Sequence, residues 1–108
     1  MKKRAKIHLT EGNINNNHVY LREHHGMFPA DSFGGPNRAS GEGKYLKLHV
    51  KGIDEVVETD IDGDKMIFRR RDWCERFFKL HGLLAGDCLV IERLEDYEYA
   101  IYPNKKAG

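Results

Sequence analysis

The sequence DWCERFFKLHGLLAGDCLVIE, residues 72–92, decides the fold class. Its first half carries large apolar side chains at helical spacing, namely Trp73, Phe77, Phe78, Leu80 and Leu84. Asp72 stands at the N-cap with Glu75 three residues later, as in a capping box, and Gly82 provides a left-handed stop. After Gly86-Asp87 turns the chain, the apolar run over 88–92 is typical of a central strand. We therefore predict a helix over 73–81 and a buried strand soon after it.

Shorter patterns on the N-terminal and C-terminal sides of this stretch predict further strands. Residues 44–50 alternate, with Leu46, Leu48 and Val50 on one face, as in a half-buried strand. Residues 56–61 and 65–69 flank Asp62-Gly63, a pair that favours a tight hairpin turn. Strands are also expected at 7–9, 18–21 and 97–102, helical turns at 22–28, and loops at 10–17 and 31–41. This predicts a mainly β, β-rich α+β domain or barrel of about seven strands and one or two helices.

Composition places the chain among single globular domains. It has 108 residues, 40% hydrophobic and 32% charged, so we expect one domain over 1–108 with its core at about 6–102. No apolar run approaches the roughly 20 residues of a membrane helix, and no signal-peptide h-region follows the basic residues 2–6. We expect a cytoplasmic protein that does not bind membranes. Cys74 and Cys88 are expected to be two buried thiols rather than a disulfide.

Charge is distributed unevenly along the chain. The formal net charge is only +1, whereas a nucleic-acid-binding domain is usually basic. Residues 1–50 carry eight Lys or Arg and four Asp or Glu, while residues 51–108 carry ten basic and thirteen acidic residues. This balance is compatible with one basic face.

Sequence motifs of catalysis do not occur in the chain. There is neither a phosphate-binding Gly-rich loop followed by Lys-Ser/Thr nor a nucleophile elbow. The six histidines include no His-x-x-x-His pair of the zinc-site kind. Asp60, Asp62 and Asp64 are spaced as in a calcium loop, but Gly63 falls fourth rather than sixth and Arg71 takes the place of the closing Glu. We expect no catalytic centre, no metal and no cofactor, with a small metal-dependent hydrolase built on these acids left as an alternative.

Polar segments of the chain carry side chains suited to DNA contacts. Asparagine pairs bidentately with adenine and arginine with guanine in the major groove, while backbone amides, Arg, Lys, Tyr and His hold phosphates. The candidate residues are Asn13, Asn15, Asn16, Asn17, His18, Tyr20 and Arg22 in the first segment, Asn37, Arg38 and Ser40 in the second, and Arg69 and Arg70 in the third. Solvated surface loops and charge runs have the same composition, so both interpretations stay open.

The order of these motifs resembles the B-three DNA-binding domain of plant transcription factors. Phe68, three arginines, Asp72-Trp73, Phe77-Phe78 and the turn Gly82-Leu83-Leu84-Ala85-Gly86-Asp87 follow one another as in that family, and Phe28-Pro29 is similar to the end of its first helix. The same fold forms the DNA-recognition domain of restriction endonucleases of the EcoRII and BfiI type. The sequence looks bacterial and resembles these relatives more than the plant proteins.

The resemblance, over roughly residues 6–102, implies a seven-stranded open pseudobarrel with two short helices. It implies two arms that grip duplex DNA in the major groove, the first at 10–20 and the second near 59–69. The second arm adds Asp60, Asp62 and Lys65 to the candidate contacts. The family tends to carry Trp, Asn and Ser there, so the acids are a departure, although a carboxylate can accept from the cytosine amino group.

The favoured interpretation is a sequence-specific double-stranded DNA-binding module, without catalysis of its own, linked to a restriction-modification or defence system. A nuclease or methyltransferase on a partner chain would then supply the chemistry. The alternatives are a protein-interaction or small-ligand-binding β-barrel and the metal-dependent hydrolase.

Overall fold

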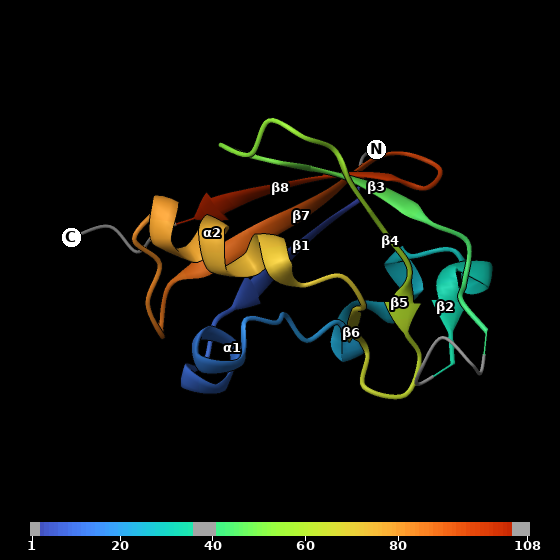
Figure 1. The fold of residues 1–108 in the computed structure, drawn as a ribbon, viewed down its shortest axis with the longest axis horizontal. Helices are drawn as coiled ribbons and strands as arrows, with labels where there is room; N and C mark the ends of the chain where they lie inside the picture. The colour runs from blue at the N-terminus through green and yellow to red at the C-terminus, as the bar shows by residue number, and fades with distance from the viewer. Residues whose placement is uncertain (1–2, 36–40, 105–108) are drawn as a thin grey trace.

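The computed structural model describes residues 3–35 and 41–104, which form a β-rich α+β domain (Figure 1). The described strands make two sheets that do not close on each other. The larger sheet has the order β1 (Arg4–His8), β7 (Cys88–Glu95), β8 (Glu98–Asn104), β3 (Leu46–Val50) and β4 (Val57–Thr59). The smaller sheet has the order β2 (Phe33–Gly34), β5 (Ile61–Asp62) and β6 (Ile67–Phe68). The predicted fold class is therefore confirmed at the level of a β-rich α+β domain, and the described chain has eight strands rather than seven.

The helix and central strand predicted from residues 72–92 are both present. Helix α2 (Asp72–Leu80) buries Trp73, Cys74, Phe77 and Phe78, and β7 lies between β1 and β8. The Trp73 indole Nε1 donates to the Arg70 carbonyl at 2.8 Å, which satisfies its polar atom inside the core. The hydrophobic core cluster draws residues from Ala5 to Ile101.

Two details of that helix were predicted wrongly. Leu80 and Leu84 are 57% and 68% exposed, because only Trp73, Cys74, Phe77 and Phe78 point toward the sheet. The N-cap position is occupied by Arg71, without a side-chain cap, and Asp72 is already helical. Its carboxylate accepts from Arg70 Nε instead, at 3.0 Å.

The predicted loop at 10–17 is wrong, because residues Glu11–Asn16 form helix α1. The Thr10 side chain accepts from the Asn13 amide, while the Asn13 side chain accepts from the Thr10 amide, at 3.1 and 2.9 Å. This reciprocal capping box stabilises the first turn. Asn17 then ends the helix in the left-handed conformation, with φ 53°.

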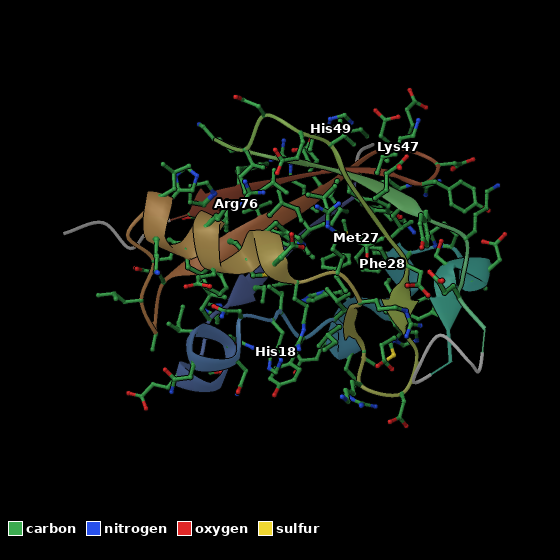
Figure 2. The ribbon with its side chains drawn as sticks, viewed as in Figure 1. His18, Met27, Phe28, Lys47, His49 and Arg76 are labelled. Atoms are coloured by element: carbon green, nitrogen blue, oxygen red, sulfur yellow. The ribbon has the colours of Figure 1, made fainter. Side chains whose placement is uncertain are left out.

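The region from 18 to 34 is mostly helical turns and irregular chain. The strand predicted at 18–21 is wrong, because the described chain has no strand there, although Val19 and Leu21 are buried as the alternation indicated. The predicted helical turns occur as the 3-10 helix η1 (Arg22–Met27), and the short η2 (Ala30–Ser32) follows. The buried Tyr99 hydroxyl donates to the Met27 carbonyl at 2.8 Å, which holds the end of η1 against β8. Figure 2 shows Met27 and Phe28 in the interior of the molecule.

The predicted hairpin is present, but its turn is longer. Strands β5 and β6 pair with Ile61 opposite Phe68, so residues 63–66 form a four-residue turn. The left-handed residue is Met66, with φ 59°, rather than Gly63. Asp62 Oδ1 accepts from the amides of Asp64 and Lys65 at 2.9 and 3.0 Å and so holds the turn.

Asp60 joins the two sheets. It is the single residue between β4 and β5, so the chain passes from the larger sheet to the smaller at this point. A Cβ added to Gly34 would lie 2.5 Å from Asp60 Oδ2 and 2.7 Å from the Gly43 amide nitrogen. Glycine is required where β2 approaches this corner so closely.

Both cysteines are free and buried, as predicted. Within 3–35 and 41–104, the helices are all too short or too polar to cross a membrane.

Candidate nucleic-acid interface

Residues from three separate segments, namely 16–22, the β5–β6 turn and the start of α2, meet on one side of the molecule. We call this surface the His18 face, and it comprises Asn16, Asn17, His18, Tyr20, Arg22, Lys65 and Arg71. In Figure 2, His18 lies between α1 and β6 at the lower edge of the molecule, whereas Lys47 and His49 lie near β3 at the upper edge.

Arg71 connects α1 to the start of α2 on this face. Its Nη1 lies 3.3 Å from His18 Nδ1 and 3.5 Å from the Asn16 carbonyl oxygen, to which it donates. The His18 and Tyr20 rings are in contact, with centroids 4.6 Å apart. Arg22 donates from Nη2 to the Asp64 carbonyl at 3.4 Å, which brings the β5–β6 turn and its exposed Lys65 to the same surface.

Burial and two nearby cations lower the pKa of His18 and so favour its neutral form. Burial lowers its pKa first, and the positive charges of Arg71 and Lys65 lower it further. Since the Arg71 guanidinium can only donate, the neutral imidazole accepts at Nδ1 and carries its proton on Nε2. That Nε2 is buried and has no hydrogen-bond partner within the described chain. The face therefore combines three cations, Arg22, Lys65 and Arg71, with a ring whose Nε2 has no hydrogen-bond partner within the described chain.

The four asparagines of the first segment have different roles. Asn13 is 1% exposed and closes the capping box of α1, so it does not reach the outer surface. Asn15 and Asn16 are exposed, and Asn16 Nδ2 donates to the Gly12 carbonyl at 3.0 Å. Asn17 is the left-handed C-cap. The exposed amides of Asn15 and Asn16 are those that could contact base edges.

Asp60 and Arg69 form a buried ion pair instead of projecting toward a ligand. Arg69 donates from Nε to Asp60 Oδ1 at 2.6 Å and from Nη2 to Oδ2 at 2.9 Å. Its Nη2 also donates to the Gly35 carbonyl at 2.7 Å, and the Gly43 amide donates to Asp60 Oδ2 at 2.8 Å. This cluster fastens β2, β5 and β6 together.

The remaining candidates divide between exposed, buried and undescribed positions. Arg70 is exposed and pairs with Asp72 at 3.0 Å, a contact that solvent screens. Asp62 is buried in the turn that it caps. Asn37, Arg38 and Ser40 lie outside the described residues.

Sequence reasoning did not single out Arg71 from the run of three arginines. Nothing in that run indicates that Arg69 turns inward, Arg70 pairs locally and Arg71 reaches α1. Only the position of α1, which was expected to be a loop, determines which arginine lies beside it.

The acids at 60–64 do not converge on a common point. Asp60 is neutralised by Arg69 and Asp62 caps the turn, and among residues 3–35 and 41–104 no three His, Cys, Asp or Glu side chains are grouped to hold a metal ion. The carboxylates of Asp60 and Asp62 instead hold the strands and the turn of the smaller sheet.

Comparison with protein-family models found none that matches this chain, and comparison with curated proteins found no match. The chemistry of the His18 face has to be inferred from its own residues.

Proposed function

We propose that this chain is a sequence-specific double-stranded DNA-binding module, without a catalytic centre of its own, that contacts DNA through the His18 face. The observation that carries the proposal is the convergence of α1, Tyr20, Arg22, Lys65 and Arg71 on one surface. Cations, exposed amides and an aromatic ring are the side chains from which DNA contacts are made.

Some residues of the His18 face would contact base edges, and others would contact phosphates. Asn16 and Arg22 are exposed; an Asn amide both donates to and accepts from the adenine edge, and an Arg guanidinium donates twice to the guanine edge. Lys65 and Arg71 are exposed cations whose charges both act on His18, and they are suited to phosphates. Arg70 is exposed and pairs with Asp72 outside the His18 face, and we propose it as a further phosphate contact.

The finer fold assignment is part of this proposal. A pseudobarrel places two arms on one side of its sheets, and α1 and the β5–β6 turn are the segments that meet at the His18 face. A nuclease or methyltransferase partner chain in a restriction-modification or defence system would supply the reaction.

One observation favours the protein-interaction alternative. Leu80 and Leu84 are exposed, and Leu84 lines a hollow of about 460 Å³ together with Ile14, Phe78 and Leu83. Asn17 of the His18 face also lines this hollow, so the two surfaces adjoin and a partner docked there would lie next to bound DNA.

The experiment is selection from a randomised duplex library at two salt concentrations, followed by sequencing. Specific recognition predicts enrichment of a short motif and an affinity that falls as salt rises. Absence of binding at low salt would reject the proposal and favour the protein-interaction alternative.

Variants separate the two kinds of contact. Asn16→Ala or Arg22→Ala should lower affinity for the selected site by ~1–3 kcal/mol and relax specificity at one position. Arg70→Ala should weaken all sequences alike and flatten the salt dependence. Equal losses on every sequence from both kinds of variant would show that these roles are assigned wrongly.

A further inference from the structure

A hollow of about 440 Å³ opens beside the His18 face. Its lining comes from β1, the start of α1, residues 20–24 and the β5–β6 turn, and includes Lys6, Asn13, Tyr20, Arg22 and Lys65. A volume of this size is in the range of small-ligand pockets, which begin at about 300 Å³. The DNA-contact proposal uses its rim and leaves its interior without a role.

The hollow is electropositive. Lys6, Arg22 and Lys65 reach it from three separate segments, whereas Glu23 contributes a carboxylate to its lining. His8 and His24 also line it and add ring nitrogens. This set favours a ligand with an anionic group such as a phosphate.

Asn13 supplies a buried donor with no acceptor. Its residue is 1% exposed, and its Nδ2 has no hydrogen-bond partner within the described chain, while its Oδ1 is used by the Thr10 amide. An unpaired buried donor destabilises the folded protein, so a ligand acceptor that reached Nδ2 would recover that energy. Since Nδ2 is screened from solvent, contact with a ligand requires a small shift of a side chain on the rim.

Tyr20 offers an aromatic face at the same place. Its side chain is 50% exposed although it lines the hollow, and the His18 ring lies at 4.6 Å from it. A nucleobase gains binding free energy by stacking on such a ring, whatever its sequence identity. A phosphate site alone would not need this ring.

We infer that the hollow binds one nucleotide unit, with its base on Tyr20, a base acceptor at Asn13 Nδ2 and its phosphate among Lys6, Arg22 and Lys65. The inference rests on the proposed function if the bound nucleotide is an unpaired nucleotide of a DNA strand. A free nucleoside monophosphate presents the same chemistry, and the experiment distinguishes these two sources.

The test measures binding of four probes to the full chain by calorimetry and fluorescence anisotropy. They are the deoxynucleoside 5′-monophosphates, inorganic phosphate, a fully paired duplex and the same duplex with one bulged nucleotide. We expect monophosphates to bind at least tenfold more tightly than inorganic phosphate, or the bulged duplex tenfold more tightly than the paired one. Monophosphate binding without a bulge preference identifies free nucleotides as the source.

Matched variants assign the site. Asn13→Asp keeps the acceptor for the Thr10 amide but replaces the donor, so it should lower binding of the preferred probe at least tenfold. Tyr20→Ala removes a half-exposed ring, so the protein should still fold, and it should also lower binding of the preferred probe. This variant tests the site if Asn13→Asp fails to fold. Lys47→Ala, on the outer side of β3, should bind as the wild type does.

The inference is overturned if monophosphates bind no better than inorganic phosphate and the bulge makes no difference, or if Asn13→Asp and Tyr20→Ala, once folded, bind normally. These results are distinct from failure of the proposed function, which is loss of binding to every paired duplex.

Discussion

Arg69→Met should lower the free energy of unfolding more than substitution of any exposed arginine in the run 69–71. The substitution removes both hydrogen bonds from Arg69 to the Asp60 carboxylate and leaves that carboxylate, at 1% exposure, with the Gly43 amide. It also frees the Gly35 carbonyl that Arg69 Nη2 now satisfies. The result is a buried charge without its counter-ion at the corner where β4 continues into β5.

The magnitude follows from burial. Breaking a buried ion pair by removing one partner costs about 3–5 kcal/mol, a large share of the 5–15 kcal/mol typical of a whole domain. The neighbouring Arg70→Met is the matched control, because its pair with Asp72 is exposed and worth about 1 kcal/mol or less.

The stability of both variants is measured by urea unfolding, with tryptophan fluorescence as the signal. We expect the midpoint to fall much further for Arg69→Met than for Arg70→Met, with the m-value unchanged. The double variant Asp60→Asn/Arg69→Met, which buries no charge, should lose less than the sum of the single variants. Equal midpoints for Arg69→Met and Arg70→Met would refute this reasoning.

The same pair predicts a pH dependence. Burial alone would raise the pKa of Asp60, but the Arg69 hydrogen bonds, the Gly43 amide and the Arg69 charge outweigh it and hold the pKa below its ordinary value. A lowered carboxyl pKa contributes stability that is fully present above the unfolded value of about 3.9 and is lost as pH falls through the folded value. The stability difference between wild type and Asp60→Asn should therefore shrink below about pH 4.

Two other predictions concern local features of the fold. Thr10→Ala removes the side-chain half of the capping box on α1 and should cost about 1 kcal/mol in urea unfolding, and an unchanged midpoint would contradict the role of that cap. Burial raises the pKa of Cys74 to about 12, so iodoacetamide at about pH 8 should leave Cys74 unmodified in the folded protein and alkylate it after unfolding, as mass spectrometry of its peptide would show. Rapid alkylation of Cys74 in the native state would contradict its burial.

The elements with strong periodicity were predictable from the sequence. Helix α2 and strand β3 each carry a period of apolar residues that only one backbone geometry brings to a single face. Leu80 and Leu84 continue the helical spacing but lie beyond the buried core. The spacing of apolar residues does not show where the core ends, because that depends on the tertiary packing.

Helix α1 was not predictable by the same means. A six-residue helix rich in Asn and Gly has the composition of a turn, and its capping box uses Asn13 where Glu or Gln is usual. The signal that would have found it is Thr10 followed three residues later by a side chain able to bond back.

The pairing of Asp60 with Arg69 depended on hairpin register. A two-residue turn at Asp62-Gly63 would have placed Asp60 opposite Lys65, whereas the observed four-residue turn places it opposite Arg69. Asp62 determines this turn by accepting two backbone amides, and one shift of register changes every partner in the hairpin. The candidate contacts near 59–69 were therefore assigned to a ligand although two of them bind each other.

The central claim is that the His18 face binds duplex DNA through its cations. The most direct measurement is the salt dependence of duplex affinity, by fluorescence anisotropy, for wild type, for Arg22→Ala/Lys65→Ala/Arg71→Ala, and for the control Lys44→Ala/Lys47→Ala. The account predicts that the triple variant loses affinity and that its slope of log K against log salt flattens by roughly 0.9 for each phosphate contact removed, those of Lys65 and Arg71, whereas loss of the Arg22 base contact lowers affinity without changing the slope and the control matches wild type. Equal slopes and affinities for all three proteins would contradict it.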